Sequence, residues 1–133
     1  MAPGTGPILV VEDEALVALD LQRTLEDYGY EVIGVAASLG EALELAYHRP
    51  PALVLMDIRI KGAADGIQTA AVLRSRFDVK VIYLTAHGDQ ETRELSAWTL
   101  PAGYLVKPLR KEDLRKMVAE VLGEATQKAK ADL

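Results

Sequence analysis

Short runs of consecutive apolar residues recur along the chain and alternate with stretches in which apolar residues repeat at helical spacing. Uninterrupted runs of this length are typical of strands that are buried on both faces, as in a parallel sheet. The predicted strands cover residues 8–11, 31–35, 53–57, 81–85 and 104–106. Strand and helix alternate five times, which predicts an α/β fold: a doubly wound, five-stranded parallel sheet with helices on both faces.

The predicted helices differ in how clearly the sequence marks them. Ser38 followed by Glu41, and Asp65 followed by Gln68, match the capping-box pattern that starts a helix. The first helix has its apolar face at Ala18, Leu21, Leu25 and Tyr28, with Gly29 at its end. Leu16 and Leu19 lie off this face, either as ordinary surface leucines or as part of a partner-binding surface. Residues 89–99 predict a short, weakly amphipathic helix. A final helix, which ends at Gly123, is marked by Leu114, Met117, Val118, Val121 and Leu122.

Composition limits the classes of protein to consider. The 133 residues suffice for one domain, which we expect at residues 8–123, after a flexible lead-in at 1–7 and before a charged tail at 124–133. The net charge of −5 argues against general affinity for nucleic acid. The chain has no cysteine, no secretory signal and no apolar run near the roughly 18 residues of a membrane span. We therefore expect a cytoplasmic protein with no membrane insertion and no direct nucleic-acid contact.

Polar side chains follow four of the five predicted strands, at the point where each strand ends. They are Glu12 and Asp13, Asp57, Thr85, and Lys107. Taken singly, each has an ordinary explanation: an acidic helix start, a turn aspartate, a strand threonine and a Lys-Pro turn. Because the carboxyl ends of parallel strands share one edge of the sheet, where such folds bind ligands, we expect these side chains to meet.

Three carboxylates at one place repel one another and need a counter-charge. Lys107 supplies one positive charge, and Mg²⁺ would supply two more through the hard oxygen ligands that it prefers. The set contains no histidine or cysteine, which disfavours zinc or copper. A carboxylate beside a cation, an ammonium group and a hydroxyl is equipped to attack phosphorus and form an acyl phosphate. The chain lacks a Walker-type phosphate loop, so we do not expect the donor to be a nucleotide bound in that way.

These residues resemble the receiver domain of two-component response regulators. The resemblance rests on Val11-Glu12-Asp13-Glu14, Leu55-Met56-Asp57, Thr85-Ala86 and Tyr104-Leu105-Val106-Lys107-Pro108. They occur in the family's order and spacing, and the similarity covers about residues 8–122. It implies a flavodoxin-like (βα)₅ fold with strand order 2-1-3-4-5.

The resemblance also implies a role for each site residue. Asp57 would accept a phosphoryl group from the phosphohistidine of a sensor histidine kinase. Asp13 directly, Glu12 often through water, Asp57 and the backbone carbonyl of Arg59 would hold Mg²⁺. Thr85 and Tyr104 resemble the pair that switches conformation, Thr85 moving toward the phosphoryl group and Tyr104 turning inward. Lys107 would contact phosphoryl oxygens and form a cis peptide bond with Pro108.

The function expected from the resemblance is a phosphorylation-controlled switch rather than an enzyme, with only self-catalysed phosphorylation and dephosphorylation. With no output domain expected after residue 123, we expect output through contact with an unknown downstream protein. The expected contact surface is the face formed by the fourth helix, the last strand and the last helix. A phosphorylation-dependent homodimer is a further option. Two alternatives stay open: a phosphate shuttle to a histidine phosphotransfer protein, and a receiver piece of a larger regulator or hybrid kinase. A degenerate interaction module is disfavoured, because the set of Glu12, Asp13, Asp57, Thr85 and Lys107 is intact. An aspartyl-phosphate hydrolase is disfavoured, because Asp57-Ile58-Arg59 lacks that family's second acid.

The chain departs from the usual receiver pattern at three places, and two further residues stand at positions that vary in the family. Lys61 stands where many receivers have proline, and Asp65-Gly66 comes one residue later than usual. Pro101 is expected to shorten the fourth helix or alter its exit. His87 stands with Arg59 at variable positions where the family modulates dephosphorylation, although a solvent-exposed loop histidine is an equal explanation.

Overall fold

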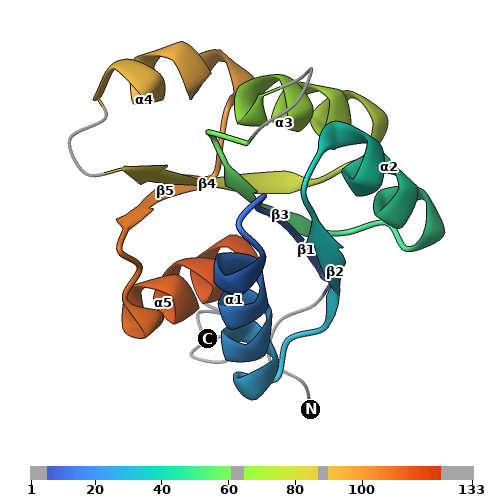
Figure 1. Ribbon diagram of the computed structural model, residues 1–133, viewed down its shortest axis with the longest axis vertical. Helices are drawn as coiled ribbons and strands as arrows, with labels where there is room; N and C mark the ends of the chain where they lie inside the picture. The colour runs from blue at the N-terminus through green and yellow to red at the C-terminus, as the bar shows by residue number, and fades with distance from the viewer. Residues whose placement is uncertain (1–5, 61–64, 87–89, 124–133) are drawn as a thin grey trace, which may run out of the picture.

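A computed structural model describes residues 6–60, 65–86 and 90–123. It is a three-layer α/β structure in which α2, α3 and α4 cover one face of the sheet and α1 and α5 cover the other (Figure 1). The strands are β1 (Ile8–Val11), β2 (Val32–Ala36), β3 (Leu53–Asp57), β4 (Lys80–Ala86) and β5 (Gly103–Lys107). The helices are α1 (Ala15–Asp27), α2 (Leu39–His48), α3 (Gly66–Arg76), α4 (Gln90–Ser96) and α5 (Lys111–Val121), with a 3₁₀ turn η1 (Ala97–Thr99) after α4.

The sheet is parallel throughout, and its strand order β2-β1-β3-β4-β5 confirms the predicted fold. Every residue of β1 and β3 is buried, as their uninterrupted apolar runs predicted. Side chains alternate between the two faces, so each strand contributes to two separate apolar cores. One core lies under α2 and α3, and the other lies under α1 and α5.

Both predicted capping residues start helices. The Ser38 side chain accepts a hydrogen bond from the backbone N–H of Glu41, while the Glu41 carboxylate accepts from Ala37 rather than from Ser38. Asp65 and Gln68 form the complete reciprocal pair at the start of α3. Gly29, with φ of 95°, takes the left-handed conformation after α1. The strands β4 and β5 extend one residue beyond the predicted bounds at each end, and β2 is shifted by one residue.

The fourth helix differs most from a regular element. The predicted helix over residues 89–99 is α4 followed by η1, and the chain then leaves through Leu100 with φ of 54°. Leu100 precedes Pro101, and a residue before proline is disfavoured in the right-handed helical conformation. The helix therefore ends early, as expected from Pro101.

Other sequence-based expectations concern parts of the chain that are not described. Lys61, His87, most of the lead-in and the tail at residues 124–133 lie outside the described residues. Within the described part, no helix combines the length and apolar character that crossing a membrane requires.

Candidate functional site

The carboxyl edge of the sheet brings together the residues that the sequence singled out. Glu12 follows β1, and Asp57 is the last residue of β3. Thr85 is the penultimate residue of β4, and Lys107 is the last residue of β5. They meet because all five strands run in the same direction and β3 pairs with both β1 and β4. Asp13, Asp57, Arg59, Thr85 and Lys107 line a hollow of about 360 Å³ at this edge.

Lys107 connects the two buried carboxylates of the site. Its Nζ lies 2.9 Å from Oε1 of Glu12 and 3.0 Å from Oδ2 of Asp57. The Glu12 side chain is 0% exposed and that of Asp57 is 9% exposed, so both carboxylates are largely shielded from solvent. A buried carboxylate needs a paired charge, and the ammonium group of Lys107 provides it for both acids.

The pKa values of the two carboxyl groups shift in opposite directions. Burial, and then the proximity of Asp57, raise the pKa of Glu12 to about 7, despite the hydrogen bond from Lys107. Burial also raises the pKa of Asp57, but hydrogen bonds from Glu12, the Arg59 backbone and Lys107 outweigh this effect, so the pKa is lowered. The Arg59 N–H donates to Oδ1 of Asp57 at 3.0 Å. Asp57 is therefore held as a carboxylate at neutral pH, while Glu12 carries a proton for part of the time.

The donor set fits a hard divalent cation. Glu12, Asp13 and Asp57 each offer a carboxylate oxygen, and these oxygens lie within 4.8 Å of one another. Several carboxylates close together, part buried and part facing an open hollow, match the way proteins bind Mg²⁺ with some of its waters retained. The structure thus brings together the three carboxylates that the sequence assigned to a metal.

Thr85 lines the same hollow and carries a buried hydroxyl. Its residue is 2% exposed, and Oγ1 is buried without a hydrogen-bond partner in the described structure. A buried hydroxyl without a partner costs free energy, so an acceptor arriving in the hollow would gain this bond at once.

Two residues that support the site were not assigned a role from the sequence. Gly66 begins α3 so close to β3 that a Cβ there would lie 2.2 Å from the Asp57 carbonyl oxygen. Glu14 lines the hollow, and its N–H donates to Oε2 of Glu12 at 3.4 Å. The Asp-Gly pair at residues 65–66 was the available signal for Gly66, and a close approach of backbone to backbone is what it marks.

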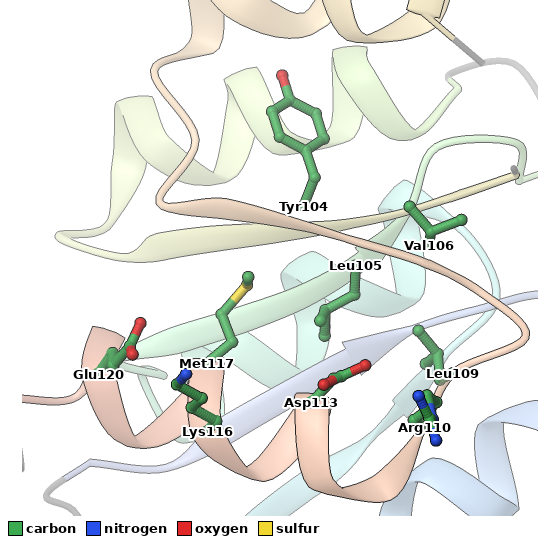
Figure 2. Close-up of a pocket in the computed structure, with 9 residues that line it drawn as sticks. All are labelled: Tyr104, Leu105, Val106, Leu109, Arg110, Asp113, Lys116, Met117 and Glu120. Carbon is green, nitrogen blue, oxygen red and sulfur yellow. The ribbon is translucent and has the colours of Figure 1, made fainter. Parts of the chain in front are cut away.

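Tyr104 lies on β5, directly beside Tyr83 in the β4–β5 register. The two rings stack with their centroids 5.7 Å apart, and the Tyr104 hydroxyl is 2.8 Å from Oγ of Ser96 in α4. Figure 2 shows Tyr104 pointing away from α5, whereas Leu105 points toward it. On the Leu105 side, a groove of about 430 Å³ runs between β5 and α5. The Lys107–Pro108 peptide bond is cis.

Comparison with known proteins gives the same result as the geometry. The family model of the response regulator receiver domain matches residues 8–119. Transcriptional regulatory protein PdtaR of Mycobacterium tuberculosis is 37% identical over 107 residues, which are 80% of this chain and 52% of that protein. The phyllosphere-induced regulator PhyR of Methylorubrum extorquens is 33% identical over 86% of this chain and 43% of that protein. The chain thus spans about half the length of the curated relatives that it matches.

Solved structures agree in fold. The signal receiver domain of a modulated diguanylate cyclase from Desulfovibrio desulfuricans superposes with a TM-score of 0.82 and 33% identity, covering 92% of this chain and 98% of that one. The receiver domain of Erythrobacter litoralis PhyR superposes with a TM-score of 0.77 and 29% identity, covering 90% of this chain and 91% of that one. The chain therefore belongs to the receiver domains of response regulators, the proteins of two-component signalling.

Proposed function

We propose that Asp57 accepts a phosphoryl group from the phosphohistidine of a sensor histidine kinase or of a histidine phosphotransfer protein. The observation that carries this proposal is the pairing of Asp57 with Lys107 at 3.0 Å beside a buried, unpartnered Thr85 hydroxyl. A carboxylate held ionised is a competent nucleophile, and an ammonium group and a hydroxyl are what a transferred phosphoryl group needs around it. The protein acts as a phosphoacceptor and not as an enzyme that turns over a separate substrate.

In the proposed transfer, a carboxylate oxygen of Asp57 attacks phosphorus, the O–P bond forms and the P–N bond to the donor imidazole breaks. The imidazole leaves with the bonding electron pair and takes up a proton. Lys107 neutralises phosphoryl oxygens without losing a proton, because its hydrogen bonds to Glu12 and Asp57 raise its pKa in spite of burial.

Glu12, Asp13, Asp57 and the backbone carbonyl of Arg59 would hold Mg²⁺ in this reaction. When bound, the ion would supply positive charge that lowers repulsion between the carboxylate and the phosphoryl oxygens. Lys107 would then exchange its contacts with Glu12 and Asp57 for contacts with the phosphoryl group.

Phosphorylation would create contacts that exist in one conformation only. Thr85 would gain an acceptor for its hydroxyl, and Lys107 would gain phosphoryl oxygens as partners. A ligand shifts a two-state equilibrium only through such differential contacts. We propose that the shifted conformation is recognised by a downstream protein at α4, β5 and α5, where the groove beside Leu105 offers a docking surface.

Mass spectrometry of the intact protein tests the proposal. The protein is incubated with acetyl phosphate in the presence and absence of Mg²⁺, and a known receiver serves as the positive control. A single phosphoryl addition is expected that requires Mg²⁺, disappears in Asp57→Asn and persists in Asp20→Asn, which alters an exposed aspartate of α1. Uptake that persists in Asp57→Asn would identify another acceptor and refute the assignment.

The metal assignment has its own test. Asp13→Ala removes one of the three clustered carboxylates, so a higher Mg²⁺ concentration should be needed for half-maximal phosphorylation. An unchanged Mg²⁺ dependence would show that Asp13 is not a ligand.

A further inference from the structure

Four hydroxyl groups form two hydrogen-bonded pairs, Tyr83–Thr99 and Ser96–Tyr104, that connect the sheet with the α4–η1 segment, and we call these four groups the hydroxyl chain. The Tyr83 hydroxyl is 2.7 Å from Oγ1 of Thr99, and Oγ1 of Thr99 donates to the Ser96 carbonyl at 2.6 Å. Oγ of Ser96 is in turn 2.8 Å from the Tyr104 hydroxyl. Ser96 is 0% exposed and Thr99 is 6% exposed, so these bonds are not shared freely with solvent.

The two pairs of the hydroxyl chain differ in which hydroxyl can donate. A threonine hydroxyl has one proton, and that of Thr99 goes to the Ser96 carbonyl, so Tyr83 must donate to Thr99. Ser96 and Tyr104 both reach the Arg93 carbonyl, at 3.1 and 3.3 Å, so either hydroxyl can donate there while the other donates across the pair. The Tyr83–Thr99 hydrogen bond therefore has one fixed direction and holds η1 on β4. The Ser96–Tyr104 hydrogen bond can form in either direction and joins β5 to α4.

Tyr104 has more freedom to move than Tyr83. Tyr83 is fully buried on a strand inside the sheet, whereas Tyr104 is half-buried on the edge strand β5. The Arg93 guanidinium lies 5.1 Å from the centre of the Tyr104 ring and covers it from the α4 side. Its stack on Tyr83, the Ser96 bond and the Arg93 contact together hold the ring in its present position.

Tyr104 and Thr85 face the same layer of the molecule. Tyr83 pairs with Tyr104 and Thr85 pairs with Val106, and residues two apart on a strand point to the same face. A movement of Thr85 toward the phosphorylation site therefore opens space on the face where Tyr104 stands. If Tyr104 entered that space, its ring would move relative to α4, where Ser96 now holds its hydroxyl.

On the basis of the proposed phosphorylation of Asp57, we propose that Ser96 is a positioning residue that latches Tyr104 in the unphosphorylated conformation. Phosphorylation has to break the Ser96–Tyr104 bond, so this bond sets part of the cost of switching. The Tyr83–Thr99 bond persists in both conformations and keeps the turn that carries Ser96 attached to β4.

The same segment carries an exposed apolar surface. Leu95, Trp98 and Leu100 are 59%, 66% and 72% exposed, and they flank the residues that form the hydroxyl chain. Trp98 is the single tryptophan of the chain. Its fluorescence therefore reports on α4–η1 without any label, and release of the latch should change its emission.

The test compares Ser96→Ala, Tyr104→Phe and the double variant. Removing a bond that exists only in the unphosphorylated conformation favours the other one, so phosphorylation by acetyl phosphate should become about two- to tenfold faster in Ser96→Ala, the range for one neutral hydrogen bond. In the Tyr104→Phe background the same change should have no further effect, because the bond is already absent. Ser75→Ala is the matched control, since Oγ of Ser75 likewise donates to the carbonyl three residues before it but, among the described residues, bonds to no tyrosine.

Several outcomes would overturn the proposal. A phosphorylation rate in Ser96→Ala that is unchanged or lower, or an equal acceleration in the Tyr104→Phe background, would reduce Ser96 to a structural residue. Urea unfolding of each variant shows whether a slow rate arises from loss of fold. If the wild-type protein takes up no phosphoryl group, the proposed function fails, and the Trp98 emission of the variants decides on the latch. An emission change caused by Ser96→Ala in the wild-type background but not in the Tyr104→Phe background supports the latch. Unchanged emission in Ser96→Ala overturns it.

Discussion

Replacing Glu12 by glutamine should remove most of the pH dependence of stability near neutral pH. The Glu12 carboxyl is buried beside Asp57, and its pKa rises from 4.5 to about 7 on folding. Between these two values the folded protein binds a proton that the unfolded chain has released. The stabilisation from that proton is fully present below about pH 4.5 and is lost as the pH rises through about 7. Glutamine has nearly the same shape and does not titrate.

The magnitude follows from the difference between the two pKa values. At about 1.4 kcal/mol for each pH unit, the change from 4.5 to about 7 corresponds to an upper limit of roughly 3 kcal/mol in the free energy of unfolding. The other two groups act outside this window. The lowered pKa of Asp57 gives stability that is lost only in more acidic solution, and the raised pKa of Lys107 gives stability that is lost only in strongly alkaline solution.

The assay is urea unfolding of the wild-type protein and Glu12→Gln from pH 5 to pH 8, with a chelator present so that no divalent cation replaces the proton. The wild-type protein and the variant differ only at residue 12, so the difference between the two curves isolates the contribution of Glu12. We expect the wild-type free energy of unfolding to fall toward pH 8 by on the order of 2 kcal/mol more than that of the variant. Parallel curves would refute the reasoning, because they would show that Glu12 titrates alike in the folded and unfolded protein.

Three further predictions concern the backbone and the metal. Gly66→Ala should destabilise the protein by about 1–3 kcal/mol and slow phosphorylation, because the added Cβ would meet the Asp57 carbonyl. Gly40→Ala, where an added Cβ would meet nothing within 4 Å, should instead stabilise α2 by about 0.5–1 kcal/mol. Urea unfolding that ranks the two variants in the opposite order would contradict this. Asp65→Ala should cost about 1 kcal/mol through loss of the α3 cap, and an unchanged urea midpoint would show that the cap contributes nothing. Mg²⁺ at about ten times its Kd should stabilise the protein at neutral pH by about 1.4 kcal/mol, which would be seen as a higher thermal midpoint. The Asp13→Ala substitution should reduce this increase. Equal midpoints with and without Mg²⁺ would argue against the metal site.

The fold could be predicted because its signals are local and agree with one another. Uninterrupted apolar runs such as residues 53–56 indicate strands that are buried on both faces, and the caps at Ser38 and Asp65 mark where helices begin. The meeting of the polar strand ends followed from topology alone, because parallel strands share their carboxyl edge. The pairing of Lys107 with both Glu12 and Asp57 is a consequence of that edge.

The α4–η1 segment could be predicted only in outline. Hydroxyl side chains such as Ser96 and Thr99 carry no periodic signal, and their partners Tyr104 and Tyr83 lie on strands 8 and 16 residues away along the chain. Those contacts depend on where the helix ends, which in turn depends on the left-handed Leu100 before Pro101. The degree of burial of Asp57 could not be predicted either, because the sequence does not show how closely Gly66 brings α3 to the end of β3.

The site combines one firmly ionised carboxylate with one that holds a proton, and this difference has a consequence for the proposed metal. Asp57, Lys107 and a protonated Glu12 together carry no net charge, so the buried part of the site is balanced by the chain itself. A phosphoryl group adds negative charge that Lys107 alone does not balance, and a divalent cation would restore the balance. The same cation would displace the proton of Glu12, since a carboxylate has to be ionised to bind a metal. Proton and cation are thus alternative partners of one carboxylate, and the proton keeps the site folded while the cation would make it reactive.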